Sequence, residues 1–487
     1  MKKSSRKLKI YYYLTASYNR IPMSFSENKI TEKTLDKQTD VAICQGKLFD
    51  LQPIENKRVE VSFTASEISS DGGLLLVKDI ESRIGIIKSL VTCIEDTRHQ
   101  SYVDHSLEEI AAQRVYQIVA GYEDANDCNT LRDDTILKMS VGRLPMTGNA
   151  LASQSTMTRF ENTPRASELY NIAYVFANKF IESYPSEPPV IIIDCDDTNI
   201  DTHGGQQLTL FNNYYGEYCY MPLHIYEGLS GKLITTILKP GRRSKSANVF
   251  GILKRLVAHL RKSWKNTVII VRGDSHFCSK ELMDWCVGQP NIHFITGLTG
   301  NSILNSSVET LVKSCENEFA RYAKPIKRYH SFSYKAGSWQ NQQRVIVKIE
   351  VTSKGSNIRF IVTDLWEYRT KALYEQGYCG RGRMELNIKD HKTYLQSGRM
   401  SCNSFYANQF RLFLHSAAYV LMHSLQQNML KTKGLAAVTM KTLRERFIKI
   451  AAQVREMKTK IKVEFPASCP QVKLLENYFF EIGQLRR

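Results

Sequence analysis

Two apolar runs that each end in acidic residues constrain the fold of this chain most. The first is VIIIDCDDT, residues 190–198, and the second is TVIIVRGDSHF, residues 267–277. Continuous runs rich in β-branched residues are typical of strands buried on both faces of a sheet. Side chains alternate along a strand, so Asp194 and Asp196 should point to the same face. If the two strands are neighbours, we expect Asp196 and Asp274 to meet at one edge of the sheet.

The elements around these strands indicate an α/β fold with a mixed sheet. Residues 217–228 and 232–241 have the pattern of an antiparallel hairpin. Helices are expected over 246–263 and 280–288, and another strand over 292–298. The resulting order of strand, strand, strand, helix, strand, helix, strand is that of an RNase H-like catalytic core.

The chain is expected to contain several parts, because 487 residues are too many for one hydrophobic core. With 43% hydrophobic and 23% charged residues, its composition excludes wholesale disorder. The predicted parts are a poorly ordered basic and polar extension (1–60), an α-helical DNA-binding domain (61–185), the first part of the core (190–304), a β-rich insertion (305–365), the core segment with a third acid (366–400) and a basic helical C-terminal region (401–487).

The net charge of +18 indicates a polyanionic partner, nucleic acid before a membrane surface. From Ser401 onward there are 14 Lys or Arg against 5 Asp or Glu, although a basic run is also common on a solvated face. No apolar run approaches the length of a membrane span, and the tyrosine-rich patch closed by Arg20 does not fit a signal peptide. We therefore expect no membrane partner. The 11 cysteines form no CxxC pair, which fits a reduced cytoplasm.

Residues 151–161, LASQSTMTRFE, form a short expected helix with two possible roles. With Ser153, Ser155 and Arg159 it resembles the second helix of a helix-turn-helix, whose polar N-terminal turn meets bases and phosphates. The alternative is an ordinary helix that Ser153 and Ser155 cap.

The segment YCGRGRMELNIKDHK, residues 378–392, places a carboxylate among two cations and a phenol. Tyr378, Arg381, Glu385 and Lys392 are separated by three, four and seven residues, so in an α-helix they share one face. Arg and Lys bind phosphates, and a carboxylate offers hard oxygens to a divalent ion. The alternative is a solvated helix face that carries an i,i+4 ion pair.

Asp196, Asp274 and Glu385 together suggest a catalytic metal site. Three carboxylates with no histidine or thiolate set suit Mg²⁺, for which Mn²⁺ can substitute, better than zinc. Two such ions, about 3.5–4 Å apart, would activate a nucleophile and stabilise the leaving oxygen of a phosphodiester. Asp196 would bridge the ions, and Asp274 and Glu385 would each hold one. The alternative for any single strand-end Asp is a turn cap.

These motifs resemble the insertion-sequence DDE transposases whose third acid lies in a Y-x2-R-x3-E-x6-K signature, known as insertion-sequence group 1380. Residues 378–392 match that signature at every spacing. The family's D-x-T matches Asp196 to Thr198, and its second strand-end acid matches Asp274 in VRGDSHF. Asp194 stays open as an alternative first acid. Residues 305–365 match the family's β-rich insertion, whereas the first 60 residues have no counterpart.

The resemblance implies cut-and-paste DNA transposition by a bacterial, nucleoid-associated cytoplasmic enzyme. Such an enzyme binds the terminal inverted repeats of double-stranded DNA, frees a 3′-OH by strand hydrolysis and joins it to target DNA. It also implies that Tyr378, Arg381 and Lys392 grip the phosphate near the cleaved end, and that a second copy pairs the two ends. Two alternatives remain, an RNase H-like endonuclease without strand transfer and a domesticated DNA-binding regulator.

Overall fold

The computed structural model describes residues 49–485, apart from 63, 242–248 and 432–437. Most of the expected N-terminal extension, up to residue 48, therefore lies outside the described residues. The chain divides into two compact units, Met1–Ala65 and Ser66–Arg487. In the first, β1 (Phe49–Ile54) and β2 (Lys57–Val61) form an antiparallel hairpin.

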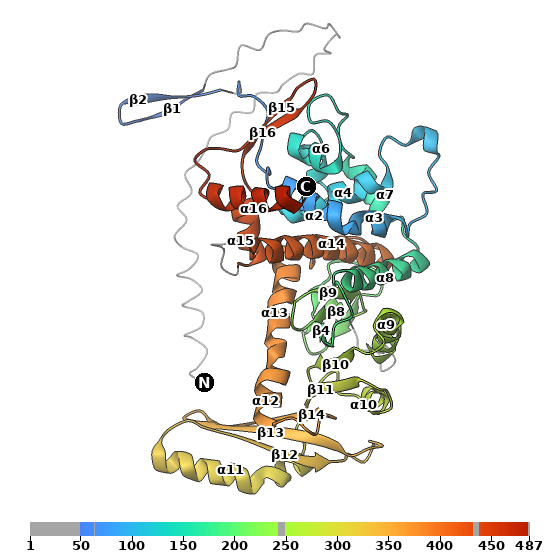
Figure 1. Ribbon diagram of the computed structural model, residues 1–487, viewed down its shortest axis with the longest axis vertical. Helices are drawn as coiled ribbons and strands as arrows, with labels where there is room; N and C mark the ends of the chain where they lie inside the picture. Colours follow the sequence, from blue (N-terminus) through green and yellow to red (C-terminus); the bar gives the residue numbers. More distant parts are fainter. Residues whose placement is uncertain (1–48, 63, 242–248, 432–437, 486–487) are drawn as a thin grey trace, which may run out of the picture. The chain divides into compact units, whose positions relative to one another are not determined.

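An eight-stranded mixed sheet is the centre of the second unit, with the order β12-β13-β14-β11-β10-β4-β8-β9 (Figure 1). Its strands in chain order are β4 (Val190–Asp197), β8 (Leu223–Glu227), β9 (Leu233–Ile237), β10 (Val268–Gly273), β11 (Ile292–Leu298), β12 (Ile326–Tyr334), β13 (Gln343–Thr352) and β14 (Gly355–Thr363). β4, β10 and β11 run parallel, and the other pairs are antiparallel. The predicted α/β class with a mixed sheet is confirmed.

Helices α9 (Val249–Ser263), α10 (Lys280–Val287) and α11 (Ser302–Tyr322) contribute to the core of this sheet. The apolar side chains of these helices and the inward side chains of the strands form one buried cluster. Ile191 and Ile193 of β4, which share one face of the strand, are fully buried in it.

Residues 305–365 differ from the expected separate insertion. Helix α11 occupies the first part, and β12, β13 and β14 continue the main sheet, because β14 pairs antiparallel with β11. The helix is easy to miss in the sequence because most of its residues are polar. Its buried positions, Leu304, Val308 and Cys315, fall on one side, and the Asn301 side chain caps its start by accepting from the Leu304 amide.

Helix α14 (Phe405–Met429) is the centre of a second core, formed by helices from both ends of the unit. Four N-terminal helices pack against it or against each other beside it: α2 (Leu74–Ile84), α4 (Leu107–Ala120), α6 (Thr135–Val141) and α8 (Ala166–Glu182) (Figure 1). Residues of the expected 61–185 and 401–487 parts therefore share one hydrophobic core in this structure. Apolar side chains of α14 lie around most of its circumference, so this helix needs packing partners on all sides.

Shorter elements complete the unit, and among the described residues no helix is both long and apolar enough to cross a membrane. Those of the N-terminal half are β3 (Ile68–Ser69), α3 (Ile86–Val91), α5 (Asp127–Leu131), α7 (Gln154–Glu161), β5 (Ile200–Asp201), β6 (Leu210–Asn212) and β7 (Glu217–Tyr220). Those of the C-terminal part are α15 (Met440–Leu443), β15 (Ala452–Glu456), β16 (Ile461–Glu464) and α16 (Val472–Leu485). β15 pairs with β16 and β3, so the C-terminal region is not wholly helical.

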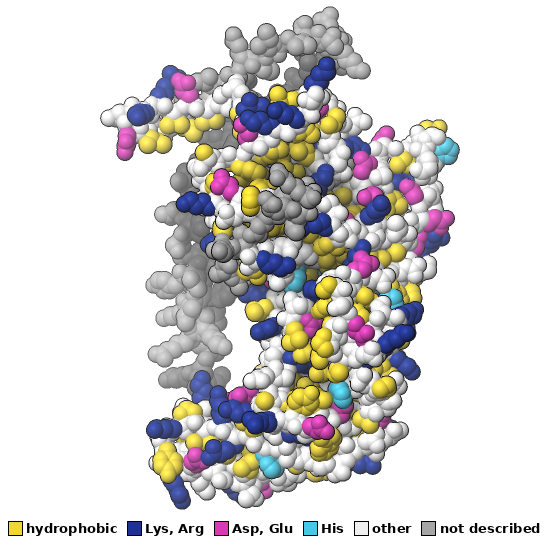
Figure 2. Space-filling view, in the orientation of Figure 1, with side chains coloured by type: hydrophobic (Ala, Val, Ile, Leu, Met, Phe, Trp, Pro, Cys, Tyr) yellow, Lys and Arg dark blue, Asp and Glu magenta, His cyan; other side chains and the backbone are white. Residues whose placement is uncertain are grey.

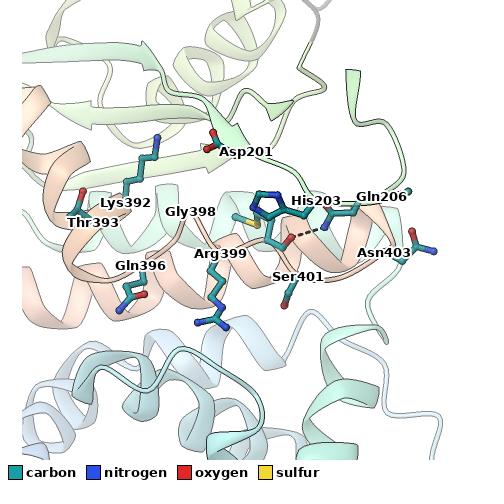
Figure 3. A pocket seen from close by; sticks show the side chains of 12 residues that line it. Asp201, His203, Gln206, Lys392, Thr393, Gln396, Gly398, Arg399, Ser401 and Asn403 are labelled. Carbon is teal, nitrogen blue, oxygen red and sulfur yellow. Dashed lines mark hydrogen bonds between the residues drawn. The ribbon is translucent and has the colours of Figure 1, made fainter. Parts of the chain in front are cut away.

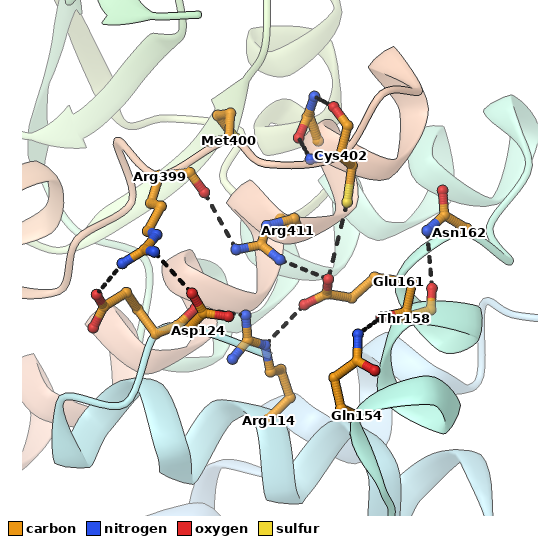
Figure 4. A network of polar contacts seen from close by, with 12 residues as sticks. Arg114, Asp124, Gln154, Thr158, Glu161, Asn162, Arg399, Met400, Cys402 and Arg411 are labelled. Atoms are coloured by element: carbon orange, nitrogen blue, oxygen red, sulfur yellow. Dashed lines mark hydrogen bonds and ion pairs between the residues drawn. The ribbon is translucent and has the colours of Figure 1, made fainter. Parts of the chain in front are cut away.

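A buried network of ion pairs holds helix α7 in this core, and no tight turn joins α7 to α6 (Figure 4). Glu161 accepts from Arg114 Nε of α4 at 2.8 Å and from an Arg411 guanidinium nitrogen of α14 at 2.6 Å. Residues 142–153 separate α6 from α7, longer than the three- or four-residue turn of a helix-turn-helix. A compact helix-turn-helix is therefore absent here. Ser153 precedes the helix, but its side chain makes no capping hydrogen bond.

We predict that Glu161→Ala lowers the free energy of unfolding by about 3–5 kcal/mol, because it leaves two buried guanidinium groups without their carboxylate. Urea denaturation measures the change. The matched control is Glu445→Ala, which breaks a pair with Lys441 in which both side chains are 59% exposed. It should cost less than about 1 kcal/mol. Equal losses in the two variants would contradict the role given to Glu161.

Candidate active site

The two predicted strand-end acids lie at one edge of the main sheet. β4 and β10 are parallel neighbours with Asp194 opposite Arg272. Asp196 and Asp274 each lie two residues further along the chain. Burial raises the pKa of Asp196 to about 6; the charge of Arg381 opposes that rise, and the nearby Asp274 carboxylate adds to it. The expectation that β4 and β10 are neighbours is confirmed.

Arg272, for which the sequence alone suggested no role, makes a buried ion pair under this edge. Its Nε and a terminal nitrogen donate to the two Asp194 oxygens at 2.5 and 2.6 Å, and both side chains are almost fully buried. Burial raises the pKa of Asp194, and Arg272 opposes that rise. Both carboxylate oxygens of Asp194 are thus occupied within the protein. The signal for this pair was a lone Arg inside an otherwise apolar strand.

The same Arg272 also ties the sheet to the segment that carries the third predicted acid. Its other terminal nitrogen donates to the Gly377 carbonyl at 2.5 Å. A Cβ placed on Gly380 would lie 2.8 Å from that nitrogen, so only glycine permits this approach. Similarly, a Cβ on Gly297 of β11 would lie 2.8 Å from the Tyr378 hydroxyl oxygen. Close backbone contacts therefore fix Tyr378 and its neighbours against the ends of the strands.

Residues 370–394 form one helical rod that changes its pitch four times along its length (Figure 1). Its parts are α12 (Thr370–Ala372), the π-helical η2 (Leu373–Tyr378), the 3₁₀-helical η3 (Cys379–Arg381), α13 (Gly382–Lys389) and the π-helical η4 (Asp390–Tyr394). The expectation of one uniform α-helical face is therefore wrong. Wider π turns re-aim the side chains that follow them and are frequent at functional sites.

Arg381 lies between the first and third predicted acids. One of its terminal nitrogens lies 2.9 Å from an Asp196 oxygen, and the other lies 3.8 Å from a Glu385 oxygen. Burial opposes the charge of Arg381, but the charge and hydrogen bond of Asp196 and the charges of Asp274 and Tyr378 together outweigh burial and raise its pKa. The guanidinium is thus the counter-charge of the acids in this structure.

Tyr378 and Lys392 take different places around the acids. Tyr378 is half-buried, packs its ring against Tyr374 and is close enough to Asp274 for that charge to contribute to its raised pKa, whose main cause is burial. The Lys392 ammonium donates to the Asn199 carbonyl, just after β4, at 2.5 Å. It also lines a cavity of about 940 Å³ that includes Asp201, His203 and Arg399 (Figure 3).

The three carboxylates do not form a closed metal cage here. The Glu385 side chain is 68% exposed, and its pair with Arg381 is long. Among the residues that the structure describes, no three His, Cys, Asp or Glu side chains come close enough together to hold a metal ion. The donors nevertheless suit a hard divalent cation, since all three are carboxylates grouped around one guanidinium.

Comparison with known proteins places this chain in a family. The family described as Transposase DDE domain group 1 matches residues 51–487. The chain belongs to the DDE transposases. It is therefore a transposase, an enzyme of DNA transposition. No curated protein matches it.

Among solved structures, this transposase is similar to the piggyBac transposase in its synaptic complex with hairpin DNA. The two chains are 12% identical, the match covers 78% of this chain and 80% of that one, and the TM-score is 0.43.

We predict that substitutions distinguish the two candidates for the first acid, Asp194 and Asp196. Asp194→Ala should lower the free energy of unfolding by about 3–5 kcal/mol, because Arg272 then stays buried without a partner. Asp196→Asn should keep the fold and abolish DNA cleavage. In EDTA at pH 8 it should be more stable than wild type by up to about 3 kcal/mol, since it no longer carries a desolvated charge.

The pH dependence provides the control for this prediction. The pKa of Asp196 rises from 3.8 to about 6 on folding, so its favourable contribution is complete below pH 3.8 and is lost as the pH rises through 6. The advantage of Asp196→Asn should therefore vanish near pH 4. A stable Asp194→Ala together with an unfolded Asp196→Asn would contradict both assignments.

Proposed function

We propose that this transposase moves an insertion sequence by cut-and-paste transposition, with Asp196, Asp274 and Glu385 as its catalytic acids. The observation that carries the proposal is the position of Arg381 between Asp196 and Glu385, with Asp274 beside it. It supports the convergence of three acids from distant parts of the sequence on one site. The Y-x2-R-x3-E-x6-K spacing of group 1380 supports the same residues.

We further propose that the strands around β4 form an RNase H-like core. The supporting observation is the order β9-β8-β4-β10-β11, in which three antiparallel strands stand beside two that run parallel to β4. The acids lie where parallel strands end, which is the edge at which open α/β sheets place their ligands.

In this proposal Asp196, Asp274 and Glu385 hold two Mg²⁺ ions, for which Mn²⁺ can substitute. When bound, such ions activate the attacking oxygen and neutralise charge on the leaving oxygen. Arg381 offers a planar fork that fits phosphate oxygens, whereas Lys392 offers a point charge. We propose that an arriving DNA phosphate draws Arg381 away from Asp196 and Glu385, which frees both carboxylates. Tyr378 positions the same phosphate from the other side.

Two phosphodiester displacements act on the strand that is transferred, and the second strand must be cleaved as well to free the element. A water oxygen attacks the phosphorus at the element's end, and the 3′ oxygen of the terminal nucleotide leaves and takes up a proton. That 3′-OH then attacks a target phosphodiester, so one bond forms as one breaks and no external energy source is needed. Two ends must be joined together, so a second copy of the chain is the proposed protein partner.

Basic side chains on the surface support a double-stranded DNA partner. On the face shown in Figure 2, Lys and Arg side chains gather over the β12–β13 end of the sheet and over β15 and β16. Arg321, Lys324 and Lys327 are exposed in the first area, and Lys460 and Lys462 in the second. We propose that the helical core, residues 66–185 together with the region after 401, binds the terminal repeats.

We predict that the purified enzyme, with Mg²⁺, a plasmid carrying the element's ends and a target plasmid, gives cleaved and joined products. Asp274→Asn should reduce both products by a factor of 10³ or more, on the order expected when a catalytic metal ligand is lost. Gel analysis of the products measures this. Cleavage without joining would favour the endonuclease, and DNA binding without cleavage would favour the regulator.

We also predict that Lys392→Ala weakens binding to end DNA and lowers the slope of log affinity against log salt by about 1, because one phosphate contact is lost. Fluorescence anisotropy at several salt concentrations measures the slope. Lys313→Ala, which changes a 67% exposed side chain paired with Glu309, is the matched control. An unchanged slope for Lys392→Ala would refute a phosphate contact at this residue.

A further inference from the structure

A short hairpin beside the acids exposes several aromatic rings. It comprises β6, β7 and the turn between them, residues 210–220, and we name it the aromatic hairpin. Tyr214 is 82% exposed, Tyr218 59% and Phe211 45%. Phe211 and Tyr218 are register partners whose ring centroids are 5.4 Å apart. Exposed rings grouped in this way are typical of a surface that contacts a partner.

The hairpin is held firmly at its base. The Asn212 amide donates to the Gly241 carbonyl at 2.8 Å, and the buried Tyr220 donates its hydroxyl to the Gln207 carbonyl at 2.6 Å. Next to it, the Gln206 amide donates to the Met400 carbonyl at 2.6 Å. The rings therefore stand on a supported frame, so their exposure is a property of the folded chain.

Direct contacts connect this frame to the active site. Lys392 donates to the Asn199 carbonyl, and the Asn199 side-chain amide donates to Glu217 of the hairpin at 2.6 Å. Burial raises the pKa of Tyr215. The neighbouring Tyr214 adds to that rise, and the charges of Asp196 and Asp197 add further. The hairpin is thus linked to Lys392 through Asn199, and its Tyr215 lies close to the first acid.

The composition of the hairpin suits bases rather than phosphates. LFNNYYGEYCY contains no Lys or Arg, and its one charged residue is Glu217. Phosphate contacts are available instead from Arg381 and Lys392. Aromatic side chains stack on any base whose face is free, whereas the bases inside a duplex already stack on each other. The partner that fits best is therefore a DNA strand with unpaired bases.

We propose that the aromatic hairpin stacks on unpaired bases of the DNA end held at Asp196 and Asp274, with Tyr214 and Tyr218 as the stacking rings. This inference rests on the proposed function, because it assumes that the reacting DNA end lies at these acids. It adds a requirement of its own: the end must open locally beside the reacting phosphodiester. Stacking then holds the opened strand in place while Arg381 and Lys392 hold its phosphates.

The test compares two forms of the element's end, one fully paired and one with a short unpaired flank that carries 2-aminopurine. Tyr214→Ala/Tyr218→Ala should lower affinity for the unpaired form about tenfold or more and prevent quenching of the probe. Its affinity for the paired form should stay within about twofold of wild type. Tyr214→Phe/Tyr218→Phe keeps the rings and should behave as wild type. Tyr368→Ala, 61% exposed in the loop after β14, is the control.

Three outcomes would overturn the stacking role. Equal loss on both DNAs would show a general DNA contact, and no loss on either would show no contact. A change from dimer to monomer with DNA affinity intact would make the hairpin a contact between copies. The single variant Tyr214→Ala, checked by circular dichroism, gives a second test if the double variant unfolds. If the wild-type enzyme failed to cleave the DNA end, the proposed function would be refuted. If the wild-type enzyme cleaved normally and the Tyr→Ala variants behaved like it, only the role of the hairpin would be refuted.

Discussion

The buried ion pair between Arg272 and Asp194 is the interaction on which the rest of the active site depends. A guanidinium is costly to bury, and this one is compensated by both Asp194 oxygens and by the Gly377 carbonyl. One side chain thereby joins β4, β10 and the start of the signature helix. With these three fixed, Asp196 and Asp274 emerge together at the sheet edge, and Arg381 is brought over them. The Arg272–Asp194 pair thus positions the two strand-end acids, although it lies outside the proposed catalytic trio.

Excess negative charge explains the state of the site in this structure. Asp196 is partly desolvated and close to Asp274, so its pKa is raised to about 6 and the pair needs a cation nearby. Arg381 supplies that charge from the protein itself. A guanidinium can exchange its carboxylate partners for phosphate oxygens of similar geometry. The site is therefore suited to accept an anionic strand and divalent ions together, and the aromatic hairpin beside it adds a surface for bases that carries no positive charge.

Local sequence patterns predicted the elements that depend on neighbours along the chain. The apolar run of β4, the alternation that sets Asp194 and Asp196 on one face and the parallel strand that ends before Asp274 all follow from burial and strand geometry. Features that depend on distant contacts were not predictable. The role of Arg272 requires knowledge of Asp194 and Gly377 together, and the π turn at 390–394 arises where the rod meets the rest of the core. Helix α11 was missed because its apolar face is narrow, and the shared helical core because α14 recruits partners from the other end of the sequence.

If Asp196, Asp274 and Glu385 form one catalytic site, the three segments that carry them share bound ions when the DNA end is present. Replacing Mg²⁺ by Fe²⁺ and generating hydroxyl radicals cuts the backbone beside the metal, and sequencing the fragments maps the cuts. The account predicts cuts in all three segments, near residues 196, 274 and 385, in wild type and their joint loss in Asp196→Asn. Cuts confined to one segment, or unchanged in Asp196→Asn, would contradict a shared site.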